Sequence, residues 1–339
     1  MNKRELLAHW LDRTGVSALA ARAPHRDLLL VLNYHRVGDA NATPWDPGVF
    51  SASAEQFDEQ VGWVKRHLQP VGLDEGVEFV SANGRARPGG TRVLFTFDDG
   101  YLDNFEIAFP ILRSHGLQGV FFLASALVGS DQIPWWDVIA FVVKQARRRA
   151  FTLRYPAERT IDVDKQGLTE ALRQVLLLYK EPEMTDSDRF LAELQESCGG
   201  PHPGASGERL FLDWDQAGQM VAGGMAIGAH THTHRILGRL EADEQRFELS
   251  EGRRILRQRL GIAADTLAYP VGTRSSFTPA TQRLAQECGY RACFSFYGGL
   301  NFPGRTDHYN ILRSGVDGQS MARFRTQAAH TAALARFWP

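Results

Sequence analysis

The stretch Val93-Leu94-Phe95-Thr96-Phe97-Asp98-Asp99-Gly100-Tyr101 is a short apolar run that ends in two adjacent carboxylates. A continuous apolar run of this length is typical of a strand that is buried on both faces, as in parallel α/β sheets. In those folds the chemistry lies where strands end and loops begin. We therefore expect Asp98 and Asp99 to lie at the functional edge of a parallel sheet.

Six further runs resemble the strand at residues 93–97, with helical patterns between most of them. They cover residues 28–34, 120–123, 226–229, 266–269, 292–296 and 309–312. Helical spacing is clearest at residues 54–67, 105–115, 214–222, 243–260 and 278–288. Thr278 and Pro279 support the last of these, as a hydroxyl N-cap followed by proline at the first helical position. Buried strands that alternate with helices predict an α/β fold with a parallel sheet.

The alternation of strands and helices breaks between about residues 129 and 210. This segment is helical and polar, and it ends in a stretch rich in proline, glycine and serine at residues 199–207. We interpret it as a helical insertion or lid, at about residues 130–210, on one catalytic domain that covers residues 27–339.

Residues 1–26 are expected to form an N-terminal helical extension, since Leu6, Trp10 and Leu11 fall at helical spacing. We expect this helix to dock on the surface of the domain, because its polar face is mixed in charge. A peripheral helix that contacts a membrane is the alternative. The segment lacks the pattern of a secretory signal, so we expect a cytoplasmic protein.

The overall composition argues against several classes of protein. The chain has 339 residues, of which 43% are hydrophobic and 23% charged, as in ordinary globular proteins. A net charge of -1 gives no global field that favours nucleic acid. Three cysteines without a C-x-x-C pair argue against a disulfide framework and a thiolate metal site. No stretch approaches the ~20 apolar residues of a transmembrane helix.

A second segment that could bind a metal is His230-Thr231-His232-Thr233-His234. On a helix, His230 and His234 would share one face, with about 5–6 Å between their Cβ atoms. On a strand, all three histidines would line one face. Two imidazoles and one carboxylate leave an open coordination position, as in catalytic zinc sites. The alternatives are a histidine-rich surface loop here and a simple turn at the aspartate pair.

These motifs resemble those of the polysaccharide deacetylases, carbohydrate esterase family 4, with its NodB-homology domain. The resemblance rests on Thr-Phe-Asp-Asp-Gly-Tyr at 96–101, on Gly-x-His-Thr-x-Thr-His at 228–234 and, more weakly, on Tyr-Pro-Val-Gly at 269–272. It covers roughly residues 27–315. It implies a distorted (β/α)7 barrel, which agrees with the seven predicted strands.

The resemblance also implies a role for each matching residue. Asp99, His230 and His234 would bind a divalent metal, usually Zn²⁺. Asp98 would be the general base that takes a proton from the reacting water. The backbone N–H of Val271 would help to hold the oxyanion as the tetrahedral intermediate forms.

Two positions depart from the family pattern. Ala268 stands where the family has an arginine that pairs with the base. We expect Arg313 to replace that arginine, with an ordinary surface position as the alternative. The C-terminal Leu-x-His that supplies the family's general acid is also absent, because Arg313 and Ser314 follow Leu312.

Amide cleavage still needs a proton for the departing amine, and His35 is our candidate for the general acid. It lies in Tyr34-His35-Arg36-Val37, which resembles a segment of the poly-N-acetylglucosamine deacetylase branch, where the motif order is permuted and this histidine is the acid. A histidine with a purely structural role at a strand end is the alternative, and His308 and His330 are the rival candidates.

The branch implies that the substrate is an N-acetylated sugar in a bacterial surface polysaccharide or its precursor. Trp135, Trp136, Tyr101 and Trp214 are candidates for stacking on a sugar ring, with core packing as the alternative. An O-acetyl esterase or small-molecule deacylase would use the same site. A glycan-binding pseudoenzyme is a third hypothesis. The two departures from the family pattern favour it, whereas the intact base and metal ligands argue against it.

Overall fold

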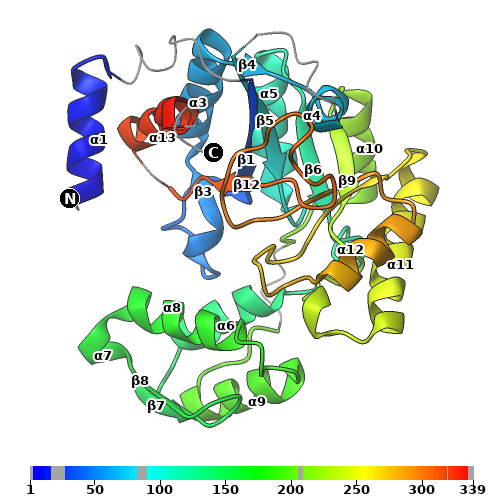
Figure 1. The fold of residues 1–339 in the computed structure, drawn as a ribbon. Helices are drawn as coiled ribbons and strands as arrows, with labels where there is room; N and C mark the ends of the chain where they lie inside the picture. The colour runs from blue at the N-terminus through cyan, green and yellow to red at the C-terminus, as the bar shows by residue number, and fades with distance from the viewer. Residues whose placement is uncertain (1–2, 17–26, 82–89, 205–208, 319, 335–339) are drawn as a thin grey trace. The chain divides into compact units, whose positions relative to one another are not determined.

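The computed structural model describes residues 3–16, 27–81, 90–204, 209–318 and 320–334. The chain divides into two compact units (Figure 1). The first consists of Met1–Asp39, Val49–Ser130 and Phe211–Pro339, and the second of Ala40–Gly48 and Asp131–Leu210.

The first unit is built around a nearly closed barrel of parallel strands. Their spatial order is β11-β10-β9-β6-β5-β1-β12, and the short β4 (Gln69–Pro70) pairs with β5 off this path. An isolated parallel bridge between Phe294 and Ile311 joins the two ends of the order. The predicted (β/α)7 barrel is therefore confirmed. The strands are β1 (Leu28–Tyr34), β5 (Thr91–Phe97), β6 (Gly119–Leu123), β9 (Ala226–Ala229), β10 (Thr266–Ala268), β11 (Ala292–Phe294) and β12 (Arg313–Gly315).

The last strand lies a few residues later than predicted. We expected it at residues 309–312, whereas regular pairing begins at Arg313, which is in register with Val31 of β1. The reason is that Ile311 pairs with β11, at the opposite end of the strand order. Its N–H donates to the carbonyl oxygen of Cys293 at 2.9 Å. The predicted segment therefore closes the barrel, and the regular strand follows it.

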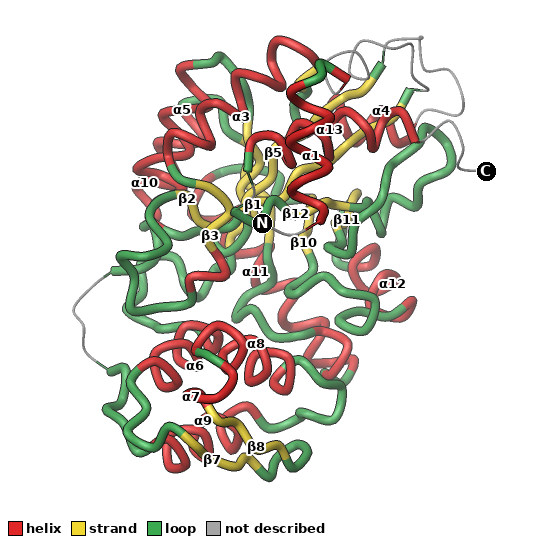
Figure 2. Tube along the Cα trace, turned by 90° about the vertical axis from the view of Figure 1, so that its left-hand side faces the viewer, coloured by secondary structure: helices red, strands yellow, loops and turns green. Residues whose placement is uncertain are grey.

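Helices cover the strands of the first unit (Figure 2). Ser53 and Gln56 form a capping box at the start of α3, and Thr278 caps α12 as predicted. The predicted helix at 105–115 begins with a π-helical turn, η2, before it becomes α-helical. The helices are α3 (Ala54–His67), α4 (Leu73–Ser81), η2 (Asn104–Ala108), α5 (Phe109–Ser114), α10 (Trp214–Ala222), η3 (Leu237–Arg239), α11 (Ala242–Leu260) and α12 (Pro279–Glu287), and the remaining short elements are β2 (Arg36–Val37), η1 (Pro47–Val49) and β3 (Phe50–Ala52).

Side-chain alternation on β1 explains how polar groups reach one end of the barrel. Leu28, Leu30 and Leu32 pack in one apolar cluster, whereas Leu29 and Val31 pack in another with residues of β5, β6 and β11. Because successive side chains on a strand point to opposite faces, the next residue in the second row is Asn33. The row thus changes from apolar to polar at the carboxyl end of β1.

The N-terminal helix α1 (Lys3–Arg13) packs against α13 (Met321–Leu334), as Figure 1 shows. Arg325 on α13 bonds to Asp12 at 3.0 Å, and Ser320 bonds to Glu5 at 2.7 Å. The helix therefore docks on its own unit, as we expected, and its contact with a membrane stays a prediction. Within the described ranges, no helix combines the length and apolarity that crossing a membrane requires.

The second unit has an apolar core of its own, formed by its helices and a two-stranded antiparallel sheet. Residues 40–48 belong to it, since Asp46 N–H donates to Asp137 at 2.8 Å. Trp135 stacks on Tyr179 with 4.0 Å between ring centroids, so core packing accounts for one of the candidate rings for stacking on sugar. The elements are α6 (Trp135–Lys144), β7 (Ala150–Leu153), β8 (Arg159–Asp162), α7 (Val163–Gln166), α8 (Leu168–Tyr179) and α9 (Ser187–Cys198).

Candidate metal centre

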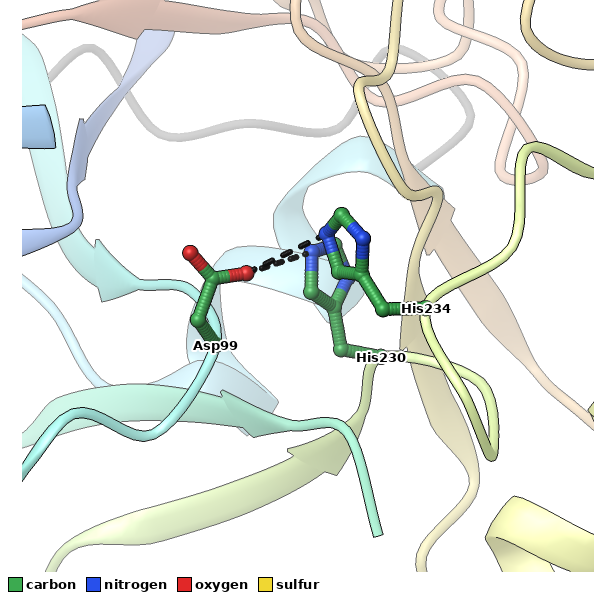
Figure 3. A group of neighbouring side chains, drawn as sticks. All are labelled: Asp99, His230 and His234. Carbon is green, nitrogen blue, oxygen red and sulfur yellow. Dashed lines mark ion pairs between the residues drawn. The ribbon is translucent and has the colours of Figure 1, made fainter. Parts of the chain in front are cut away.

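Three predicted ligands meet at the carboxyl ends of β5 and β9 (Figure 3). Oδ1 of Asp99 lies 3.4 Å from Nε2 of His230 and 3.2 Å from Nε2 of His234. All three residues are buried, and their ligand atoms lie within 4.8 Å of one another. The structure thus brings together segments that lie more than a hundred residues apart in the chain.

The three residues fit a tetrahedral metal ion. With ligand bonds of about 2.0–2.2 Å, neighbouring ligand atoms in such a site lie roughly 3.3–3.6 Å apart, close to the two distances here. Among the described residues, the buried Oδ1 of Asp99 has no hydrogen-bond partner of good geometry. A cation bound between this oxygen and the two imidazole nitrogens would supply the partner that the oxygen lacks.

Unusual backbone conformations cluster around this centre. Of five described non-glycine residues with positive φ, four lie in its loops: Asp99 (φ 74), Thr231 (φ 62), His234 (φ 60) and Val271 (φ 62). Each such residue costs about 1–3 kcal/mol and persists only where the surrounding structure determines it. At Asp99 the turn separates its carboxylate from that of Asp98, so the two adjacent carboxylates have different partners.

The histidine segment forms neither the helix nor the strand that we considered. Residues 230–234 follow β9 as an irregular loop, which bends at Thr231 and His234. The bend brings His230 and His234 to one carboxylate. His232 points elsewhere, with its Nδ1 at 2.9 Å from Oγ of Ser125.

A hydrogen bond orients the ring of His230. Its Nδ1 lies 2.7 Å from the carbonyl oxygen of Ala268 on β10, which accepts the proton of that nitrogen. Such a bond fixes the tautomer and leaves Nε2 free to bind a metal. Burial lowers the pKa of His230, but Asp98 and Asp99 outweigh burial and raise it above the ordinary value.

Asp98 has a different set of partners, although it adjoins a predicted ligand. Its two oxygens accept hydrogen bonds from Nη1 and Nη2 of Arg313 at 2.7 and 2.9 Å, and Nδ2 of Asn33 donates at 3.1 Å. Burial raises the pKa of Asp98, but the charges of Arg313 and His230 hold it below the ordinary value. Asp98 is therefore an ionised carboxylate at neutral pH.

Arg313 is wholly buried, so it is not the surface arginine of our alternative prediction. Besides Asp98, it donates to Oδ1 of Asn33 at 2.6 Å and to the carbonyl oxygen of Ser295 at 3.0 Å. Its position follows from the pairing of β12 with β1, which places Arg313 beside Val31. The structure thus pairs Arg313 with Asp98. This is the position that we expected for a replacement of the arginine that the family has at residue 268.

His35 is the candidate acid that the structure places at Asp98. Its Nε2 lies 3.9 Å from Oδ2 of Asp98, and a quarter of its side chain is exposed. The rival His308 lies beside Ser81, at 3.5 Å. The side chain of the other rival, His330, lies outside the described part of the chain.

Val271 and Tyr101 complete the predicted positions. Val271 lies in the loop after β10, three residues beyond Ala268, the hydrogen-bond partner of His230. Tyr101 is buried between the guanidinium of Arg36, at 4.6 Å from its ring centroid, and Phe211, at 5.0 Å. Tyr101 is therefore buried in the core, which was the alternative to stacking on a sugar ring.

Two residues of this region were missed by sequence reasoning. Asn33 links Asp98 to Arg313, and the signal for it was present, since it is the only polar residue in the apolar run 28–34. Glu248 on α11 accepts hydrogen bonds from the histidine loop. It is one of several acidic residues on a charged helix, so nothing in the local sequence distinguishes it.

Comparisons with known proteins find a matching family model, related sequences and similar folds. A family model described as polysaccharide deacetylase matches residues 85–293. The poly-beta-1,6-N-acetyl-D-glucosamine N-deacetylase of Staphylococcus aureus is 28% identical over 121 residues, which are 33% of this chain and 41% of that protein. The chain thus matches less than half the length of that curated relative.

Two solved structures have a similar fold. The deacetylase PplD of Streptococcus pyogenes superposes with a TM-score of 0.57 at 15% identity, over 89% of this chain and 98% of that one. IcaB of Ammonifex degensii gives a TM-score of 0.56 at 20% identity, over 91% and 98% of the two chains. At these identities the likeness concerns the fold alone.

Proposed function

Because the chain belongs to the polysaccharide deacetylase family, we propose that it is a metal-dependent hydrolase that removes N-acetyl groups from an N-acetylated glycan. One observation carries the proposal: the Asp99, His230 and His234 side chains converge, while the adjacent Asp98 turns to Arg313. This arrangement separates a metal-binding carboxylate from a carboxylate that is available as a base.

The donor set suits a catalytic metal. Asp99, His230 and His234 would hold a divalent ion through one oxygen and two nitrogens, a set for which we propose Zn²⁺. When bound, the ion lowers the pKa of water towards ~7 and polarises the substrate carbonyl. Three protein ligands leave at least one coordination position open.

Asp98 is the proposed general base. It is ionised at neutral pH, because Arg313 lowers its pKa, and the bidentate contact holds the carboxylate in one orientation. Its Oδ2 lies 3.9 Å from His35 and 4.0 Å from Nε2 of His230, on the side of the candidate metal centre. From there Asp98 would accept the proton of the attacking water.

His35 is the proposed general acid, and Val271 the proposed oxyanion donor. The ring of His35 is partly exposed, and its Nε2 would donate a proton to the departing amine. The positive φ of Val271 sets the direction of its backbone N–H, which would stabilise the charge that develops on the substrate oxygen.

We propose an N-acetylglucosamine polymer as the first substrate to test. The Staphylococcus aureus relative is named for poly-beta-1,6-N-acetyl-D-glucosamine. A net charge of -1 is compatible with a neutral glycan of this kind. The wider proposal is a bacterial surface polysaccharide or its precursor.

The proposal is tested by metal analysis together with mass spectrometry of the reaction products. The purified chain is incubated with β-1,6-linked N-acetylglucosamine oligomers, chitooligosaccharides and O-acetylated sugars. Loss of N-acetyl groups, abolished by a chelator and restored by Zn²⁺, is the expected result. Activity on O-acetyl sugars alone would indicate an esterase, and bound Zn²⁺ without acetate release from any glycan would indicate a pseudoenzyme.

A further inference from the structure

We propose that Glu248 on α11 is a positioning residue, which holds the histidine loop in the shape that presents both imidazole ligands to one metal ion. The proposal rests on the metal-dependent function above. Glu248 contacts the backbone between His230 and His234, and it lies on a helix that supplies no predicted ligand. It would therefore act through the loop.

The carboxylate of Glu248 binds the amide side of the loop. Its Oε2 accepts the backbone N–H groups of His232 at 3.0 Å and of Thr233 at 2.8 Å. Its Oε1 accepts a further hydrogen bond from the hydroxyl of Thr233. Glu248 is 2% exposed, so its carboxylate is shielded from water. One buried carboxylate thus satisfies three donors from two consecutive loop residues.

The opposite side of the loop is held by the segment after β6. The N–H of Ala126 donates to the carbonyl oxygen of His232 at 2.9 Å, and the N–H of Ser125 donates to that of Thr231 at 3.4 Å. The amides of His232 and Thr233 therefore bind α11, while the carbonyls of Thr231 and His232 accept hydrogen bonds from the segment after β6. The segment after β6 holds the loop backbone through its own backbone, whereas α11 holds it through one side chain, which a single substitution can remove.

The loop needs such a clamp because its backbone is strained. Thr231 and His234 both have positive φ, which is unfavourable for residues with a Cβ atom. Such conformations persist where the surroundings determine them. Without Glu248, two backbone N–H groups would lose their acceptor, and the loop would relax towards an ordinary conformation. His234 would then leave the position where its Nε2 meets Asp99.

Metal affinity is the quantity that this role should change. Residues that orient metal ligands contribute about 10–100-fold in affinity when they are lost. Glu248→Gln retains the size of the side chain but replaces one acceptor oxygen by an NH₂ group, which faces a donor. We expect the Kd for Zn²⁺ to rise about 10–100-fold. Thr233→Val removes only the hydroxyl bond, and we expect a rise of about two- to tenfold.

The experiment measures Zn²⁺ affinity of the metal-free proteins by competition with a chromophoric chelator. Asp243→Asn is the matched control, since it removes an acidic side chain that is exposed in the first turn of the same helix. Its Kd should equal that of wild type. The unfolding temperature of each metal-free variant separates folding from binding. The visible spectrum of bound Co²⁺ should also change in Glu248→Gln, because the ligand geometry changes.

Each outcome bears on one proposal. If wild type binds no Zn²⁺, the proposed function fails. If wild type binds Zn²⁺ and Glu248→Gln binds it equally well, only the positioning role is overturned. A lower unfolding temperature with an unchanged Kd would likewise assign Glu248 a merely structural role. If Glu248→Gln does not fold, the exposed Thr233→Val variant decides, and a wild-type Kd there overturns the proposal.

Discussion

Both Nη atoms of Arg313 bind the carboxylate of Asp98, at 2.7 and 2.9 Å, although the two residues are 215 positions apart in the chain. The pair is buried, and Asp98 binds Arg313 although its Oδ2 also lies 4.0 Å from Nε2 of His230, one of the two histidines that meet Asp99. The barrel thus gives two consecutive aspartates different electrostatic surroundings. This difference predicts that substitutions at the two positions will have different effects.

Asp98→Asn should bind Zn²⁺ with wild-type stoichiometry at a pH of about 8 and lose turnover by a factor of about 10²–10⁴, because it removes a base and leaves the ligands intact. Asp99→Ala should lose metal and activity together, and so should His230→Ala. Metal analysis after dialysis and acetate release from the same samples provide the measurement. Loss of metal from Asp98→Asn would place Asp98 among the ligands instead.

Arg313→Gln should move the acidic limb of the pH–activity profile to higher pH. Burial alone raises the pKa of Asp98, and Arg313 is the largest influence that lowers it. The base acts when ionised, so activity falls as the pH drops through its pKa, and a higher pKa brings that fall closer to neutrality. Profiles of kcat/KM against pH test this, and an unshifted limb would contradict it.

The same variant should also be less stable, because it leaves the carboxylate buried without its cationic partner. Breaking a buried pair in this way typically costs about 3–5 kcal/mol. Denaturant unfolding of metal-free protein measures the loss. The activity profile must therefore be recorded where the variant is shown to be folded.

His35→Ala should retain Zn²⁺ and lose amide hydrolysis by a factor of about 10²–10⁴, because the leaving amine needs a proton. An activated ester such as 4-nitrophenyl acetate provides the comparison, since its phenolate departs without one. Ester hydrolysis should therefore fall much less. Near-normal turnover of the N-acetyl glycan would remove His35 from the mechanism.

Most of the barrel could be predicted from the sequence, because its signals are local. The bounds of β1, α3 and α10 agree residue for residue with the prediction, since continuous apolar runs and capping residues mark them. Asp213 and Gln216, for example, form a capping box at the start of α10. The last strand was misplaced because its partner depends on how the barrel closes.

The histidine loop could be predicted in composition but not in conformation. The spacing of His230 and His234 indicates a ligand pair. The bend between them depends on Glu248 and Ala126, which come from a helix and a strand end elsewhere in the chain. Glu248 and Glu251 look alike in the sequence, and only the packing of α11 shows that Glu248 is buried while Glu251 is partly exposed.

As the pH is lowered, the affinity for Zn²⁺ should begin to fall at a higher pH than it would with a histidine ligand of ordinary pKa. Asp98 and Asp99 raise the pKa of His230 in the metal-free protein despite its burial, whereas burial lowers the pKa of His234, so His230 is the imidazole ligand from which Zn²⁺ must displace a proton first as the pH falls. Below that pKa the affinity should decrease about tenfold per pH unit. Competition titrations between pH values of about 8 and 5.5 measure this. In Asp98→Asn the fall should begin at lower pH, and a flat profile for wild type would contradict the prediction.

The close approach of α11 to the histidine loop predicts that Gly252 will not tolerate a side chain. A Cβ atom there would lie 2.7 Å from the carbonyl oxygen of Thr231 and 2.8 Å from its carbonyl carbon. Gly252→Ala should therefore displace the loop or the helix. Overpacking of this kind costs about 1–3 kcal/mol, against a gain of about 1 kcal/mol in helix propensity.

Gly218→Ala is the matched control, because Gly218 lies inside α10 and a Cβ atom there would have nothing within 4 Å. That variant should be as stable as wild type or slightly more stable, with unchanged Zn²⁺ affinity, whereas Gly252→Ala should bind Zn²⁺ about tenfold more weakly. Thermal unfolding and chelator competition on both variants provide the comparison. Equal stability and equal affinity of the two variants would contradict the prediction, because the contact of α11 with the histidine loop would then carry no cost.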